Sequence, residues 1–273
     1  MTSNLLDFRG QVAYLGPAGS WTHQACRDLF PSAEQVPLSR DELVSAYQTG
    51  RVEYACLPVT TSLVGVTPYL DYVLAIRGVT VVAEYPKMLG YSLLVRPGTE
   101  LGDVSEVYAH PVAFEEVMPW LERELPSAKR VDAVTGGAAA RMVAESAGGD
   151  KASLGPKAGA AIYGLEALVD GIEEGPHNVT RWWVLGRISP AATGRDKTSL
   201  FVNLVDGEFT DVLSSIIAAN IRILTVYERP AKSTLDQHRY VIEIEGHCKD
   251  QTVAAFLRNH PRMTVLGSYA RRY

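Results

Sequence analysis

The stretch VAYLGPAGSWTHQA, residues 12–25, runs from a short apolar strand through a glycine-containing turn into a helix. Gly16 and Gly19 allow this turn to approach another group closely, because glycine has no Cβ. Ser20 stands directly before the helix and is a preferred N-cap residue. Because the free amides of a helix N-terminus suit an anion, the turn predicts a carboxylate-binding site at Gly19 and Ser20.

Short apolar runs continue to alternate with amphipathic stretches as far as Arg187. This alternation predicts an α/β fold with largely parallel sheets. The predicted strands are residues 12–16, 54–59, 91–96, 104–109, 152–155 and 181–186. The predicted helices are residues 21–30, 112–125 and 137–146.

The segment ISPAATGRDK, residues 188–197, has no periodicity and is the best candidate for a linker. It separates two expected domains, residues 11–189 and residues 197–273. The second domain reads strand, helix, strand, strand, helix, strand, which is the ferredoxin-like βαββαβ order. Exposed sheets of this kind pair along an edge or a face, so a homodimer or homotetramer is expected.

The composition, 47% hydrophobic and 21% charged over 273 residues, is that of an ordinary soluble protein. A net charge of -5 gives no attraction for nucleic acid or anionic lipid, and a small-molecule partner fits better. MTSNLLDFRG resembles no leader and no stretch could span a membrane, so a cytoplasmic location is expected. The cysteines are few and widely spaced, which predicts no disulfide framework, metal site or cofactor.

Three segments, in chain order, resemble prephenate dehydratases. The first is residues 12–25; the second, GPKAGAAIYGLEALVDGIEEGPHNVTRWWVLGR (155–187), leads from an Ala-rich helix through Asn-x-Thr-Arg into a strand. The third, residues 203–230, is similar to an ACT regulatory domain, as is the ending VLGSYARR. The resemblance implies a two-lobed catalytic domain like a periplasmic binding protein, followed by an ACT domain. It also implies a decarboxylating carbon–oxygen lyase of phenylalanine biosynthesis, which converts prephenate or a close analogue to phenylpyruvate.

The same resemblance places the catalytic centre at Thr180, with Asn178 and Arg181 beside it and Trp182 at the aromatic position of the motif. Arg181 suits a substrate carboxylate. A threonine hydroxyl is too weak an acid to donate a full proton, so Thr180 is expected to act on the leaving hydroxyl by position and electrostatics.

Several positions depart from the family pattern. Family members carry Glu-Asn-Ser where this chain has Thr60, Thr61 and Ser62, and Gln where it has Glu116. The remaining substrate contacts that the resemblance implies are His110 and Thr135. Glu116 or His110 could supply a proton, although a charged residue on a helix face is usually solvated.

Two other functions remain open for such a chain. The altered polar shell favours a non-aromatising prephenate decarboxylase of a secondary-metabolite pathway, and the lost Glu and Asn are compatible with a non-catalytic metabolite-binding protein. In the ACT domain, the family's amino-acid effector site corresponds to Gly207, Arg229 and Pro230. Glu208 and Phe209 replace small and aliphatic groups there, so an effector site and a plain dimerisation module are both possible.

Overall fold

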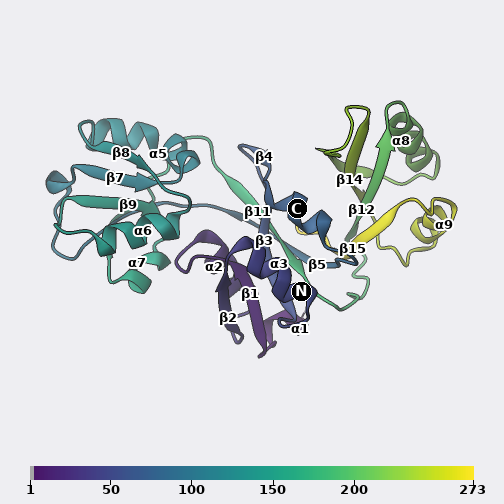
Figure 1. Cartoon of the computed structure of the whole chain (residues 1–273), viewed down its shortest axis with the longest axis horizontal. Coiled ribbons are helices and arrows are strands. Elements are labelled where there is room, and N and C mark those ends of the chain that lie inside the picture. The colour runs from purple at the N-terminus through teal and green to yellow at the C-terminus, as the bar shows by residue number, and fades with distance from the viewer. Residues whose placement is uncertain (1–2) are drawn as a thin grey trace. The chain divides into compact units, whose positions relative to one another are not determined.

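The computed structural model describes residues 3–273 (Figure 1). The chain forms two compact units, one of residues 4–67 with 86–182 and one of residues 68–85 with 183–273. Strands β5 (Val81–Met88) and β11 (Val179–Leu185) each run from one unit into the other. No helix in the described part of the chain is long and apolar enough to cross a membrane.

The first sheet has the strand order β2-β1-β3-β11-β5. Strand β1 (Gln11–Leu15) lies parallel to both β2 (Glu34–Leu38) and β3 (Tyr54–Thr61), and the short β4 (Gly65–Val66) pairs antiparallel with the end of β3. The helices of this part are α1 (Ser3–Leu6), α2 (Trp21–Leu29) and α3 (Arg40–Gln48). Helix α2 begins at the predicted residue because the Ser20 side chain accepts a hydrogen bond from the His23 amide.

The second sheet has the strand order β10-β6-β9-β7-β8. Its strands are β6 (Ser92–Val95), β7 (Glu106–Ala109), β8 (Lys129–Asp132), β9 (Lys151–Gly155) and β10 (Glu166–Asp170). Its helices are the 3₁₀ turn η1 (Leu101–Asp103), α5 (Pro111–Glu124), α6 (Gly136–Glu145) and α7 (Ala158–Tyr163).

The sheets are mixed, which corrects the expectation of largely parallel sheets. Strand β7 lies parallel to β8 and β9, whereas β6 pairs antiparallel with both β9 and β10. The chain enters this lobe along β6 and leaves it along β10. Neither strand is joined to the strand it pairs with by a single helical connection, which is the connection that makes neighbouring strands parallel. The hydrophobic pattern of the sequence predicts a strand at β6 but not whether it runs parallel or antiparallel to its neighbours.

The third sheet follows the predicted order of elements, β12 (Asp196–Val205), α8 (Glu208–Ala218), β13 (Ile223–Pro230), β14 (Gln237–Glu245), α9 (Gln251–Asn259) and β15 (Thr264–Ala270). It is antiparallel, in the order β13-β14-β12-β15. Its core joins Leu200, Val202 and Ile242 of the strands to Ile216 of α8 and Phe256 of α9. The same unit contains α4 (Tyr69–Ala75).

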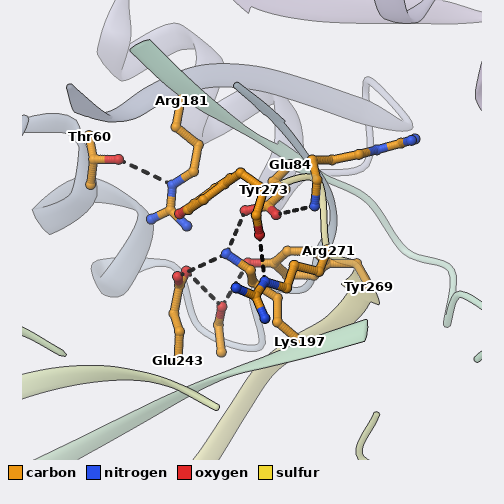
Figure 2. A network of polar contacts seen from close by, with 10 residues as sticks. Thr60, Glu84, Arg181, Lys197, Glu243, Tyr269, Arg271 and Tyr273 are labelled. Carbon is orange, nitrogen blue, oxygen red and sulfur yellow. Dashed lines mark hydrogen bonds and ion pairs between the residues drawn. The ribbon is translucent and has the colours of Figure 1, made fainter. Parts of the chain in front are cut away.

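A buried ionic network occupies the other side of this sheet (Figure 2). Successive side chains of β12 point to opposite sides of the sheet, and Leu200 points toward α8 and α9. Lys197, three residues earlier, points to the side away from these helices. Its Nζ lies 3.0 Å from Glu84 Oε2 and 3.3 Å from Glu243 Oε2, with all three side chains at most 1% exposed. The ring of Tyr273 lies 4.1 Å from the same Nζ. The network thus ties the start of β5 to the third sheet.

Candidate active site

Strand β11 carries the predicted catalytic residues on alternate sides, because successive side chains of a strand point in opposite directions. Asn178, Thr180 and Trp182 share one side, and all three are buried. Asn178 Nδ2 donates to Glu116 Oε1 at 2.9 Å, and Trp182 Nε1 donates to Thr22 Oγ1 at 3.0 Å. Thr180 therefore lies between a contact to α5 and a contact to the first turn of α2.

Arg181 points to the opposite side of β11. Its Nε donates to Thr60 Oγ1 at 3.1 Å, and the residue is 3% exposed (Figure 2). The structure thus brings Asn178 and Thr180 together but separates Arg181 from them. A carboxylate held beside Thr180 would have to be bound by other groups, since Arg181 is on the far side of the strand.

Glu116 is buried, which corrects the expectation that a charged residue on this helix is solvated. It is 1% exposed on α5, and its Oε1 accepts hydrogen bonds from Asn178 and from the Tyr91 hydroxyl, the latter at 2.9 Å. Burial raises the pKa of Glu116 to about 7, and the nearby Glu173 carboxylate adds to the rise. Within residues 3–273, neither Glu116 Oε2 nor Asn178 Oδ1 has a hydrogen-bond partner although both are buried.

The turn that contains Gly19 and Ser20 packs against the other lobe. Gly19 has φ +74°, and its amide donates to His23 Nδ1 at 3.1 Å, while Ser20 Oγ accepts from the His23 amide at 3.2 Å. A Cβ on Gly137, at the start of α6, would lie only 2.5 Å from the Ala18 carbonyl oxygen. The turn therefore brings its own backbone close to the backbone at the start of α6.

The three hydroxyl residues at the end of β3 hold local structure. Ser62 Oγ accepts from the Val179 amide at 2.8 Å and donates to the His177 carbonyl at 3.1 Å, which joins the end of β3 to the start of β11. Thr61 Oγ1 accepts from the Val64 amide at 3.1 Å and closes the following turn.

His110 and Thr135 are N-cap residues of helices in the second lobe. His110 Nδ1 accepts from the Val112 amide at 3.2 Å at the start of α5, and burial by the surrounding protein lowers its pKa. Thr135 Oγ1 accepts from the Ala138 amide at 3.1 Å at the start of α6. Because β7 and β8 are parallel neighbours, the helices that follow them begin at the same edge of the sheet.

Sequence reasoning did not identify Tyr91 as part of this arrangement. Tyr91 is the first residue of the predicted strand 91–96 and carried no signal of its own, although its hydroxyl binds Glu116 and its amide donates to Glu173 Oε2 at 2.7 Å. The ring of Trp21 meets that of Tyr91 edge-on, with centroids 5.6 Å apart. Pairing of these side chains depends on segments distant in sequence, which no local pattern reveals.

An open cavity of about 370 Å³ lies beside Tyr91, against Trp21, Gly90 and Glu173. The two lysines that line it are each paired with an acid, Lys87 with Asp28 and Lys157 with Asp170. None of the predicted site residues lines this cavity. Among the described residues, no three His, Cys, Asp or Glu side chains are grouped to hold a metal ion.

A sequence profile described as prephenate dehydratase matches residues 12–190. The chain belongs to the prephenate dehydratase family. The prephenate dehydratase of Mycobacteroides abscessus is 34% identical over 281 residues, a match that covers 96% of this chain and 90% of the relative. The family resemblance predicted from the Gly-Pro turn and the Thr-Arg motif is thereby confirmed.

Solved structures agree with this family. The prephenate dehydratase of Arthrobacter aurescens, solved in complex with L-Phe, matches with a TM-score of 0.87 and 28% identity over 96% of this chain and 90% of that chain. A protein described as a novel type of quorum quenching acylase matches with a TM-score of 0.86 over 96% of this chain and 98% of that one. At 23% identity, that second likeness shows a shared fold only. The dehydratases support a two-lobed α/β fold.

The residues that family resemblance assigns to an effector site lie in the second unit. Gly207 precedes α8 with φ +87°, and Pro230 ends β13. Arg229 is engaged in two hydrogen bonds to the Asp71 carboxylate, at 2.9 and 3.0 Å. Glu208, which replaces a small residue of the family, pairs with Arg262 at 2.7 Å, and the pairing lowers the pKa of Glu208 to about 2.

Proposed function

We propose that this chain converts prephenate to phenylpyruvate with loss of water and carbon dioxide, as a decarboxylating carbon–oxygen lyase. The observation that carries the proposal is the position of Thr180, buried on one side of β11 between Asn178, which binds Glu116, and Trp182, which binds α2. In this position its hydroxyl is available to a ring substituent held between the lobes. The family membership of the chain supports the same reaction.

Expulsion of hydroxide requires stabilisation of the charge that builds on the leaving oxygen. Thr180 would donate a hydrogen bond to this oxygen and Asn178 would hold the neighbouring group, with their value coming from fixed geometry rather than acidity. A threonine fixed on a buried strand needs little reorganisation to do so.

The two substrate carboxylates would be bound at helix N-termini. Ser20, His110 and Thr135 are the N-caps of α2, α5 and α6. The N-terminus of a helix carries a partial positive charge and unpaired amides, which suits an anion. Gly19 and Gly137 bring the starts of α2 and α6 close together, because a Cβ on Gly137 would lie 3.1 Å from the Ser20 amide nitrogen. In this arrangement Thr60, Thr61, Ser62 and Arg181 shape and support the site.

The proposal is tested by incubation of the purified protein with prephenate, followed by absorbance and mass. We expect phenylpyruvate from the parent and a loss of kcat on the order of 10²–10³ in Thr180→Ala, the size typical of a lost transition-state donor. Thr180→Ser should retain part of the activity because it keeps the hydroxyl. Thr210→Ala, at an exposed position of α8, is the matched control. A decarboxylated product that keeps its ring oxygen, or no product, would refute the proposal.

The comparisons favour neither alternative function. The curated relatives that match most of the chain are named as prephenate dehydratases, not as decarboxylases or binding proteins. Retention of Thr180 on the side of β11 that faces Glu116 is also what dehydration requires.

For the C-terminal part we propose an ACT regulatory domain of residues 197–273, after a catalytic domain of residues 11–189. The βαββαβ order of β12 to β15 supports it, and the Arthrobacter relative with bound L-Phe supports an amino-acid effector. An effector carboxylate at Arg229 would have to compete with Asp71, which already accepts hydrogen bonds from Nε and Nη2 of that side chain. A homo-oligomer and a cytoplasmic location stay predictions.

A further inference from the structure

Resting on the dehydration proposed above, we infer that Glu116 is the acid that protonates the departing hydroxyl, so that it leaves as water. Thr180 cannot supply this proton, because an alcohol is too weak an acid at neutral pH. A carboxylic acid that remains protonated near neutral pH can do so. Glu116 combines the required position, burial and hydrogen bonding.

The position follows from the geometry of β11. Asn178 and Thr180 are two residues apart on the same side of an extended chain, a separation of about 7 Å. Glu116 Oε1 lies 2.9 Å from Asn178 Nδ2, so its carboxyl group lies on the side of β11 that carries Thr180. The leaving hydroxyl of a ring held on this side of the strand would face both groups. The acid and the threonine can therefore act on the same substrate.

The hydrogen bonds distinguish the two carboxyl oxygens. Oε1 accepts from both Asn178 and Tyr91, at 2.9 Å each. Oε2 is buried and has no partner within residues 3–273. In the protonated acid, Oε1 would be the carbonyl oxygen, which accepts hydrogen bonds, and Oε2 would be the hydroxyl oxygen, which donates one. In the proposed acid, the proton is carried by the oxygen that has no hydrogen-bond partner among residues 3–273.

The surroundings favour the protonated form at neutral pH. Desolvation by burial is the largest cause of the raised pKa, about 7, and the Glu173 carboxylate contributes in the same direction. Tyr91 faces the group as a phenol whose own pKa is raised by burial and by Glu116, so it stays a neutral donor. Glu174, next to Glu173, is neutralised by its ion pair with Arg123. An acid of this strength suits proton transfer near pH 7.

Protonation by Glu116 accompanies the loss of water and carbon dioxide. The bond from the ring carbon to the hydroxyl breaks, and the hydroxyl oxygen takes the proton from Glu116 Oε2 and leaves as water. The bond from the ring to its carboxylate breaks at the same time, and its electron pair enters the ring, which becomes aromatic as carbon dioxide departs. Glu116 is left as a carboxylate and regains a proton from solvent before the next turnover. No oxidant, reductant or cofactor is needed.

The test is the pH dependence of kcat for the full chain, measured with prephenate between pH 5.5 and 8.5. We expect the kcat of the parent to fall above pH 7 as Glu116 loses its proton. Glu116→Gln, which restores the residue that family members carry here, should remove this alkaline decline, because an amide keeps the shape but has no proton to lose in this pH range. Glu115→Gln, an exposed neighbour on α5, is the matched control and should behave like the parent.

A second variant separates proton donation from structural support. Tyr91→Phe removes a hydrogen bond that holds the pKa of Glu116 down, so the alkaline decline should move to higher pH while turnover persists. If the parent forms phenylpyruvate and the decline is unchanged in both variants, the inference is overturned and the dehydration stands. If the parent forms no phenylpyruvate, the proposed function itself fails.

Discussion

The replacement Glu116→Gln should change how the stability of the protein depends on pH. The folded protein raises the pKa of this carboxyl from 4.5 to about 7, so the folded state binds a proton more tightly than the unfolded state. A group of this kind contributes stability that is present below its unfolded pKa and is lost as pH rises through its folded pKa. One pKa unit corresponds to about 1.4 kcal/mol, so the loss between pH 5 and pH 8 is on the order of 2–3 kcal/mol.

The measurement is the free energy of unfolding in urea, followed by tryptophan fluorescence at pH 5 and at pH 8. Histidines and other acids titrate in both proteins and cancel in the comparison. Relative to the parent, Glu116→Gln should therefore gain on the order of 2–3 kcal/mol on going from pH 5 to pH 8. Glu115→Gln should show no such gain, because its side chain is exposed. Parallel pH dependences for Glu116→Gln and the parent would refute the reasoning.

Three further predictions concern packing and charge. Lys197→Met removes the cation that pairs with the buried carboxylates of Glu84 and Glu243, and it should lower the free energy of unfolding by about 3–5 kcal/mol. A loss under about 1 kcal/mol would contradict the buried network. Gly137→Ala should destabilise by about 1–3 kcal/mol because its Cβ would overlap Ala18, whereas Gly102→Ala, whose Cβ would meet no atom within 4 Å, should change the melting temperature little. Asp71→Asn should destabilise the protein at pH 7 and less at pH 3. Arg229 lowers the pKa of Asp71, so the stability that this ion pair contributes is lost as pH falls. Equal losses of unfolding free energy in urea at both pH values would contradict the pairing.

Much of the local structure was predictable from short-range chemistry. Ser20 caps α2 where expected, and the C-terminal order of strands and helices matches the prediction element by element. Strand β5 was missed although it begins Val-Val-Ala, because Glu84 and Pro86 interrupt the apolar run. Glu84 is tolerated there because Lys197, more than a hundred residues later in the chain, neutralises it.

The candidate site was predictable in its members but not in its arrangement. Thr180 and Arg181 are adjacent in sequence, and a motif gives no reason to separate them. Strand alternation nevertheless places Arg181 against Thr60 on the opposite side from Thr180. The assignment of substrate binding therefore moves from the arginine to the helix N-termini.

The sequence by itself determined the family and the order of elements in the C-terminal part, and it singled out Thr180 as the expected catalytic residue, because these depend on motifs and on local propensity. Only the tertiary structure decided the state of Glu116. A helical pattern cannot distinguish a solvated glutamate from one enclosed by Tyr91 and Asn178, since both partners come from distant segments. Burial by those segments removes water from the carboxyl group, and this desolvation turns an ordinary acid into one that keeps its proton near neutral pH.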